Sequence, residues 1–222
     1  MAEMELIPVP TRILTEKDDI IDAIDHYTKG KVGPDDLICS AESVVAITQG
    51  RYVRPEDLHI TRVAQFCCRF IPDYGSLASP HGMQSLMDVE GKWRVAFALF
   101  AGFFAKLVGK SGMFYKWGGK ETAMIDDVTG TMPPFDKCIV YGPADADSVC
   151  EKIAERTGAF GAMIADVNDL KRSRVVGITK AVDGDIARML LIDNPFGNAS
   201  QKTPICIIKN YRQYQESKHG NR

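Results

Sequence analysis

The last third of the chain alternates between helix-like and strand-like patterns, and this alternation constrains the fold more than any other feature. A helix is predicted where Ser148 and Glu151 have capping-box spacing in the run "SVCEKIAERTG". Apolar runs bounded by polar or glycine-containing turns predict strands. These strands are "AFGAMIADV", "VVGITKAV" and "TPICIIKNY", with a short helix, "DIARMLLI", before the last of them. We therefore predict an α+β (mixed α/β) fold in which mixed sheets are flanked by helices.

The first part of the chain predicts further elements of both kinds. The segment "TEKDDIIDAIDHYTKG" has capping-box spacing between Thr15 and Asp18 and predicts a helix. The run "LICS" predicts a short strand that ends at Ser40. Residues 42–53 fit either a second extended segment or the start of a helix. Residues 55–70 begin with proline and carry apolar residues at helical spacing, so they predict one more helix.

The middle of the chain is predicted to be helical over residues 83–109, with a break near Gly91. Residues 109–137 follow as a glycine-rich segment with little periodicity, and a segment of this length inside a domain is often functional. The tail over residues 213–222 is predicted to fray. A length of 222 residues favours a single domain over residues 1–222, either as one body or with two lobes.

Charge, cysteine usage and hydropathy predict a soluble cytoplasmic protein. The chain has 27 basic and 29 acidic residues, and a net charge of −2 argues against nucleic acid or an anionic membrane as its main partner. The six cysteines contain no CxxC pair, which is typical of reduced thiols. The longest apolar run, residues 95–109, is interrupted by Lys106 and is shorter than the ~20 residues that a membrane span requires, so we expect a buried core helix.

The first candidate site lies in the segment "IADVNDLKRSR", where a predicted strand delivers Asp166 and Asn168 to its end. Strand ends commonly carry binding residues, and a carboxylate there suits Mg²⁺ or Mn²⁺. The basic residues that follow, Arg172 and Arg174 with Lys171, are suited to phosphate groups. The alternative is an Asx turn at Asn168 followed by a solvated basic loop between two strands.

The second candidate is the pair Asp126 and Asp127 in "MIDDVTG". Adjacent residues of an extended segment point to opposite faces, so only one of the two would face a given site. We expect Asp126 and Asp166 to hold a divalent ion together, and the alternative for the pair is a simple turn. The sequence "LVGKSG" is not a phosphate-binding P-loop, because Phe104 stands where the motif requires its first glycine.

Several stretches together resemble the coenzyme F-420-0 gamma-glutamyl ligase family, and the chain looks like a divergent, shortened member. The matching stretches, in chain order, are "ELIPVPTRILTEKDDIIDAI", "DDLICSAESVVAITQGR", "AMIDDVTGTMPPFDKCIVYGPADADSVCEKI", "GAFGAMIADVNDLKRSRVVGITKAVDG" and "DNPFGNASQKTPICIIK". The resemblance covers most of the chain and is weak over residues 52–120. It implies a gamma-glutamyl ligase-like fold, a homodimer, and a GTP-dependent ligase that uses divalent metal ions to join glutamate to a carboxylate.

The resemblance also implies roles for individual residues. Asp126 and Asp166 match two metal-binding acids, with Asp127 or Asp185 as a further ligand. Ser40 matches a residue near the nucleotide, which Asn168, Arg172 and Arg174 would also contact. Three positions depart from the family pattern, which has lysine, threonine and asparagine where this chain has Ile47, Val167 and Thr129. An apolar Ile47 cannot replace a cation beside a triphosphate.

Two hypotheses follow. The first is a metal-dependent, nucleoside-triphosphate-using amide ligase that acts on a small carboxylate, with GTP as co-substrate and Mg²⁺ or Mn²⁺ as cofactor. The second is a non-catalytic homodimeric protein that binds a metabolite or a partner on the same scaffold. The retained acids favour the first hypothesis, and Ile47 and Val167 favour the second.

Overall fold

A computed structural model describes residues 4–72, 75–125, 133–168, 171–197 and 201–220 of the chain, without the side chains of Asn168 and Arg172. The described residues form two compact units. Unit 1 comprises Met1–Gly50 and Pro143–Arg222, and unit 2 comprises Arg51–Gly142. Helices and a mixed sheet occur together, so the predicted α+β class is confirmed at this level.

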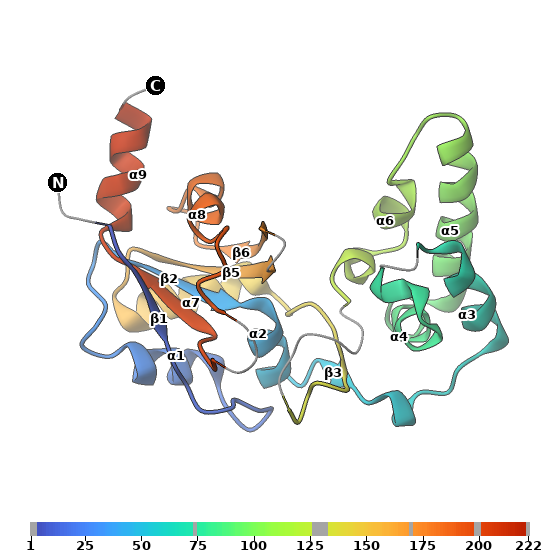
Figure 1. Ribbon diagram of the computed structural model, residues 1–222, viewed down its shortest axis with the longest axis horizontal. Helices are drawn as coiled ribbons and strands as arrows, with labels where there is room; N and C mark the ends of the chain where they lie inside the picture. The colour runs from blue at the N-terminus through green and yellow to red at the C-terminus, as the bar shows by residue number, and fades with distance from the viewer. Residues whose placement is uncertain (1–3, 73–74, 126–132, 169–170, 198–200, 221–222) are drawn as a thin grey trace. The chain divides into compact units, whose positions relative to one another are not determined.

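Unit 1 is built on a five-stranded mixed sheet with the strand order β1-β7-β2-β5-β6 (Figure 1). The bounds of the strands are β1 Leu6–Val9, β2 Leu37–Ala41, β5 Gly161–Asn168, β6 Arg172–Ile178 and β7 Ile205–Ile208. Strands β2 and β5 are parallel, and the other neighbouring pairs are antiparallel. The three strands predicted in the last third are therefore confirmed, although each has different bounds.

Helices cover both faces of this sheet. Successive side chains of each strand point to opposite sides, so each face of the sheet contributes to its own buried cluster. Ile38 and Ile164 belong to a buried cluster that includes residues of α1 (Ile20–Thr28) and α7 (Ala146–Thr157). Leu37 and Met163 belong to a second buried cluster with residues of α8 (Gly184–Leu190) and with Tyr211, the first residue of α9 (Tyr211–Gly220). The short helix α2 (Glu42–Thr48) follows β2 directly.

Two predicted helices of unit 1 are present, but their predicted caps are wrong. Helix α1 is capped by Asp19, whose carboxylate accepts hydrogen bonds from the backbone N–H groups of Ile21 and Asp22. Asp18 is engaged elsewhere, since it accepts the backbone N–H of Thr15. Helix α7 begins after Asp145, so Ser148 lies inside the helix and caps nothing.

Three further expectations for unit 1 need correction. Residues 42–48 are helical as α2, so the extended alternative for this segment is wrong. Strand β6 begins at Arg172, so Arg172 and Arg174 belong to the sheet and only the part of the basic segment before them lies outside it. The tail predicted to fray is the helix α9 up to Gly220, because Tyr211 is fully buried and anchors its start.

Unit 2 is mostly helical. Its α-helices are α3 (Arg62–Cys67), α4 (Pro80–Glu90), α5 (Lys92–Leu107) and α6 (Met113–Trp117), and a two-stranded sheet pairs β3 (Tyr52–Val53) with β4 (Ile139–Val140). Short 3-10 helices cover Pro55–Asp57, Cys68–Phe70, Ser76–Ala78 and Lys120–Ala123. Gly91, with a φ of 93°, separates α4 from α5 and confirms the predicted break. Residues 55–70 are not one helix, because the chain is extended at Leu58 and restarts at the Thr61 cap.

The helices of unit 2 pack closely around small residues and one buried carboxylate. A Cβ atom on Gly102 of α5 would lie 2.8 Å from the backbone nitrogen of Phe114, so only glycine allows α5 and α6 to approach this closely. Glu121 forms an ion pair with Arg51 and accepts the backbone N–H of Gly142 at 3.0 Å. In the described part of the chain, no helix has the length and apolar character needed to cross a membrane.

Candidate functional site at the carboxyl edge of the sheet

The parallel pair β2 and β5 places two carboxylates at one edge of the unit 1 sheet. Ser40 pairs with Ile164 and Ala41 pairs with Ala165, so the next residues, Glu42 and Asp166, lie at the same level, where β2 ends and β5 continues beside β6 alone. Parallel strands end at a common edge, and such edges commonly bind ligands in sheets of this kind. Glu42 begins α2, where the helix dipole favours a negative charge.

Arg174 bridges these two carboxylates. It lies opposite Asp166 in the β5–β6 ladder, and its Nη2 atom is 3.1 Å from Oε2 of Glu42 and 3.4 Å from Oδ2 of Asp166. The side chain of Glu42 is 10% exposed, whereas those of Arg174 and Asp166 are 39% and 41% exposed. Arg174 thus neutralises part of the charge of two carboxylates that are themselves partly shielded from water. Two acidic side chains brought together in this way are suited to a cation.

Ser40 adds a buried hydroxyl to the same edge. Its side chain is 1% exposed, and among the described residues its Oγ atom has no hydrogen-bond partner. A buried hydroxyl without a partner costs free energy that a ligand, an ion or a water could recover. Ser40 thus fits the predicted position beside a bound group.

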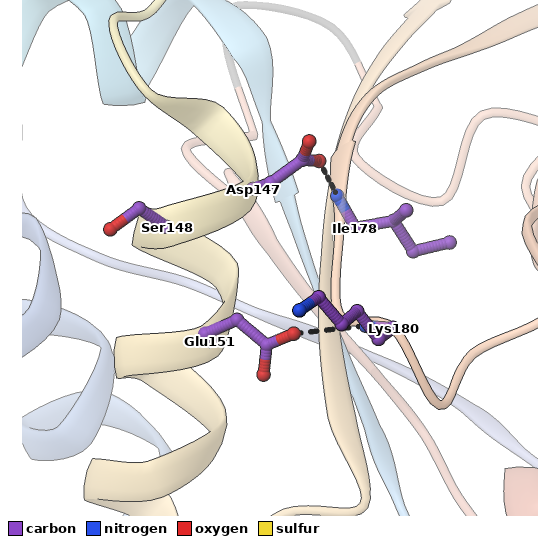
Figure 2. A pocket seen from close by; sticks show the side chains of 5 residues that line it. All are labelled: Asp147, Ser148, Glu151, Ile178 and Lys180. Atoms are coloured by element: carbon purple, nitrogen blue, oxygen red, sulfur yellow. Dashed lines mark hydrogen bonds between the residues drawn. The ribbon is translucent and has the colours of Figure 1, made fainter.

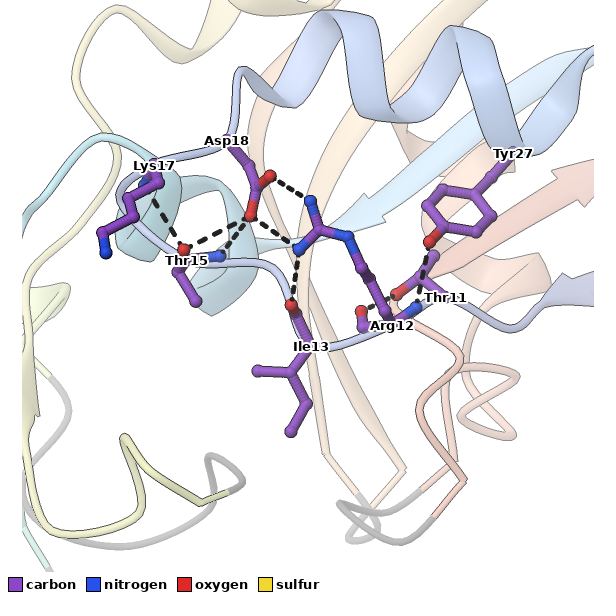
Figure 3. Close-up of polar contacts among 7 residues, drawn as sticks. All are labelled: Thr11, Arg12, Ile13, Thr15, Lys17, Asp18 and Tyr27. Atoms are coloured by element: carbon purple, nitrogen blue, oxygen red, sulfur yellow. Dashed lines mark hydrogen bonds and ion pairs between the residues drawn. The ribbon is translucent and has the colours of Figure 1, made fainter.

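The loop between β1 and α1 starts from this edge as well. Ile205 of β7 pairs with both Val9, the last residue of β1, and Ser40 of β2. The loop holds Arg12, which forms an ion pair with Asp18 through both guanidinium Nη atoms and also donates to the carbonyl of Ile13 (Figure 3). The hydrogen bond from Arg12 lowers the pKa of Asp18 below its usual value.

Two backbone N–H groups of the loop are also satisfied by side chains. Thr15 donates its backbone N–H to Asp18 at 2.8 Å, and the backbone N–H of Arg12 donates to the hydroxyl of Tyr27 at 3.2 Å (Figure 3). Arg12 nevertheless has a side chain that is 61% exposed. A second arginine is therefore presented to solvent from the same edge of the sheet, already paired with a carboxylate.

The predicted site residues fall into three groups. Ser40, Asp166 and Arg174 lie at the carboxyl edge, and Asn168 and Arg172 pair with each other in the β5–β6 ladder. Asp126 and Asp127 lie outside the described residues, so their predicted role stays a prediction. Asp185 lies in the first turn of α8 and pairs with Arg188 at 3.2 Å.

Asp185 is not brought together with Asp166. Strand β6 runs antiparallel to β5, so the chain leaves β6 at the edge opposite Asp166. Helix α8 then packs on the face of the second buried cluster (Figure 1). The family resemblance was the only basis for placing Asp185 beside Asp166, and the sequence alone does not reveal on which face of the sheet the next helix packs.

Two residues of the edge escaped the sequence analysis. Glu42 was missed because its proximity to Asp166 depends on β2 and β5 being neighbours, and strand order is not written in the local pattern. Arg12 was missed because a single arginine in a loop gives no periodic signal. Both lie within stretches that carry the family resemblance, which was the one available pointer to them.

A shallow pocket beside α7 and the end of β6 is a structural feature rather than a second site. Asp147 accepts the backbone N–H of Ile178 at 2.9 Å, and Glu151 accepts that of Lys180 at 3.0 Å (Figure 2). Strand β6 is at the edge of the sheet, so these carboxylates satisfy N–H groups that no further strand pairs with. One oxygen of each carboxylate thereby fastens α7 to β6.

The donor set of the carboxyl edge is incomplete for a metal within the described ranges. No group of three or more His, Cys, Asp or Glu side chains able to hold an ion occurs in the part of the chain that the structure describes. Glu42 and Asp166 supply hard oxygen donors of the kind Mg²⁺ and Mn²⁺ prefer, so the residues present fit part of such a site. A comparison with models of known protein families and with curated proteins found no match to the chain.

Proposed function

We propose that the chain is a metal-dependent enzyme that uses a nucleoside triphosphate to join an amine to a small carboxylate, with its reaction centre at the carboxyl edge of the unit 1 sheet. The observation that carries this proposal is the contact of Arg174 with both Glu42 and Asp166. The resemblance to the gamma-glutamyl ligases supports GTP as the co-substrate and glutamate as a model for the amine.

The charge pattern supports an exchange of cations at this edge. Without ligands, the guanidinium of Arg174 neutralises part of the charge on Glu42 and Asp166. A divalent ion that bound the two carboxylates would displace the guanidinium and leave it free to contact phosphate, which arginine binds well. Arg12 would contribute a second phosphate contact from the β1–α1 loop.

The proposed chemistry needs positioning and charge neutralisation more than reactive side chains. An oxygen of the substrate carboxylate attacks the terminal phosphorus, and the nucleoside diphosphate leaves. The amine nitrogen then attacks the acyl carbon, the bond to the phosphate oxygen breaks, and the nitrogen loses a proton. A bound Mg²⁺ or Mn²⁺ would stabilise the charge on the phosphates. Arg12 and Arg174 would orient the triphosphate, and Ser40 would donate a hydrogen bond to it.

Thermal shift and phosphate release test the proposal together. Wild-type protein with GTP and Mn²⁺ is expected to gain roughly 1–3 kcal/mol of stability through mass action and to release phosphate when amine and carboxylate are supplied. Asp166→Asn should lose both effects. Asp22→Asn is a matched control, because Asp22 is an exposed aspartate paired with Arg156. Asp126→Asn tests the second predicted metal ligand by the same two readouts.

The outcome that contradicts the proposal is equal melting with and without GTP and Mn²⁺ for wild type, with ATP and Mg²⁺ giving the same result. Loss of the stabilisation in Asp22→Asn as well as in Asp166→Asn would also contradict it, because the effect would then reflect general surface charge.

A non-catalytic binding protein is the second candidate, and one observation favours it. Ile47 lies in α2 with a side chain that is 5% exposed, so the position of the family lysine is part of the core. A protein of this kind would be stabilised by a phosphorylated metabolite bound at the carboxyl edge beside Arg174, and it would not release phosphate from GTP. Stabilisation without turnover in the assay above would establish this alternative.

A further inference from the structure

The long helix α5 of unit 2 presents a continuous apolar stripe to solvent. We call the side chains of Trp93, Phe97, Phe100, Phe104 and Leu107 the α5 stripe; they follow each other at steps of four and three residues and therefore share one side of the helix. Their exposed fractions run from 38% for Phe100 to 74% for Trp93. Isolated exposed apolar side chains are ordinary, but five on one helix face mark a binding surface.

Neighbouring elements extend the stripe. The rings of Phe66 and Phe70 lie 6.3 Å and 5.8 Å from the ring of Phe100, and both side chains are about half exposed. These seven side chains together expose an area on the order of 800 Å², which is the area that one side of a stable interface buries.

The opposite side of α5 is already used. Val95, Ala98, Leu99 and Gly102 are buried in the core of unit 2. A helix that is apolar on all sides is normally covered on all sides. The α5 stripe therefore calls for an outside occupant, and the charges around it identify the kind.

Residues 91–120, which contain the whole α5 stripe, carry six basic residues and no acidic one. The basic residues are Lys92, Arg94, Lys106, Lys110, Lys116 and Lys120. Arg94 pairs with Glu90 at 3.0 Å, and Lys92 lies over the ring of Trp93. The four lysines from 106 onward form no ion pair with any described residue. The overall charge of −2 conceals this local excess.

We infer that the α5 stripe docks unit 2 on the surface of a membrane that contains anionic lipids. Helices that lie in a membrane interface combine Trp, Phe and Leu on one side with lysine and arginine around it, as α5 does. Trp93 suits the headgroup level, and the surrounding lysines are attracted to lipid phosphates. A second copy of the chain fits less well, because pairing two stripes would bring six positive charges against six.

This inference reverses one expectation from the composition, which argued against an anionic membrane as a partner. The whole-chain charge is a sum over both units, so acidic residues elsewhere offset the local positive charge. A lipid surface responds only to charges within one Debye length of the contact, roughly 10 Å. The inference does not depend on the function proposed for the carboxyl edge, since the α5 stripe belongs to unit 2.

Vesicle binding tests the inference directly. The wild-type chain is expected to co-sediment with vesicles of phosphatidylglycerol and phosphatidylcholine, weakly with phosphatidylcholine alone, and less at high salt. Trp93 lies in the α5 stripe, and Trp117 is the only other tryptophan of the chain. The fluorescence of Trp93 should shift to shorter wavelength on binding, and Trp117→Phe leaves it as the single reporter.

Two pairs of substitutions separate the apolar and the charged contributions. Phe97→Gln with Phe104→Gln, and separately Lys106→Gln with Lys110→Gln, should each lower vesicle affinity by tenfold or more while far-ultraviolet circular dichroism stays unchanged. Lys29→Gln with Lys152→Gln removes two exposed lysines of unit 1 and should leave the affinity unchanged.

Four results would overturn the inference. The first is absence of binding to anionic vesicles by the wild type. The second is an equal loss of affinity in the Lys29/Lys152 control, which would show unspecific charge attraction. The third is a stable dimer, seen by sedimentation, that dissociates in the Phe97/Phe104 variant and does not bind vesicles, because the α5 stripe would then be an interface between two copies. Capture by an acidic polypeptide in place of vesicles would equally contradict a lipid partner.

Discussion

Unit 1 and unit 2 treat their apolar side chains in opposite ways. The sheet of unit 1 sends alternate side chains into two buried clusters, and helices cover both. Unit 2 buries one side of α5 and leaves the other side, with its five large side chains, in solvent. At its carboxyl edge, unit 1 instead exposes charged side chains, which are those of Arg12, Asp166 and Arg174. The contrast suggests that unit 1 binds a small charged ligand and that unit 2 binds an extended surface.

The largest difference between the units should appear on truncation of matched apolar residues. Ile153 of α7 is 1% exposed, so Ile153→Ala is expected to lower the free energy of unfolding by about 3 kcal/mol. Phe97 of α5 is 71% exposed, and Phe97→Ala should change it by less than about 0.5 kcal/mol. Urea denaturation followed by circular dichroism measures both. A comparable loss in Phe97→Ala would mean that the α5 stripe is covered within the chain itself.

A smaller difference is expected between the two units in how an arginine–carboxylate contact responds to Mn²⁺. The two contacts are Arg51 with Glu121 in unit 2 and Arg174 with its carboxylates at the carboxyl edge of unit 1. Arg51→Met removes the ion-pair partner of Glu121, which is largely buried in unit 2, and should cost about 2 kcal/mol. Addition of Mn²⁺ should not restore that stability, because Glu121 still accepts the backbone N–H of Gly142, and the nearby carboxylate of Glu90 is held by Arg94 and by the backbone N–H of Glu121. If Mn²⁺ rescued Arg51→Met, stabilisation by the ion would not distinguish the carboxyl edge from an ordinary buried ion pair.

Helix α8 of unit 1 depends on a charged cap, and here the effect should be about 1 kcal/mol. Asp183 accepts the backbone N–H groups of Asp185 and Ile186 and contacts His219 at 2.8 Å, so Asp183→Ala removes both a cap and a contact to α9. The hydrogen bond to His219 is the main cause that lowers the pKa of Asp183.

A lowered carboxyl pKa gives this contribution a definite pH dependence. The stabilisation is present above the ordinary aspartate pKa and is lost as the pH falls through the lower folded-state value. The difference in unfolding free energy between wild type and Asp183→Asn should therefore shrink between pH 5 and about pH 2. A difference that grew on acidification would contradict the assignment.

The smallest effect is expected for the reactivity of the cysteines. Their thiols should react very little while the protein is folded. Burial raises the pKa of Cys150 and of Cys206 in unit 1 to about 12, so at pH 8 about one thiol in ten thousand is ionised. Titration with a thiol reagent should be slow, and any early reaction should come from the unit 2 thiols Cys67, Cys68 and Cys138. Fast modification of Cys150 would show that unit 1 opens more readily than its buried clusters indicate.

Much of the secondary structure of unit 1 could be predicted, because its strands are short apolar runs with clear turns between them. The helix caps could not, since several acidic residues precede α1 and only the fold decides that Asp19 rather than Asp18 caps it. In unit 2 the pattern over residues 55–70 was misleading, because apolar spacing does not show that the chain is extended at Leu58.

The candidate site was predictable only in part for a similar reason. Local pattern drew attention to Asp166 and Arg174, but Glu42 joins them only because β2 and β5 are neighbours. Likewise, the periodicity of α5 indicated an apolar helix, and the expectation of a buried one was wrong for the side that carries the α5 stripe. Periodicity reports which residues share a face and does not report what covers that face.

The account rests most on Glu42 and Asp166 forming a cation site that Arg174 fills in the absence of ligands. A matched control exists, because Arg156 also bridges two carboxylates, Asp22 and Asp25, in a more exposed setting. The direct measurement is a titration with Mn²⁺ in which electron paramagnetic resonance follows the free ion, for wild type, Arg174→Met and Arg156→Met. The account predicts that Arg174→Met binds Mn²⁺ about tenfold more tightly than wild type, while Arg156→Met does not differ from it. Unchanged Mn²⁺ affinity in Arg174→Met, or an equal gain in both variants, would contradict it.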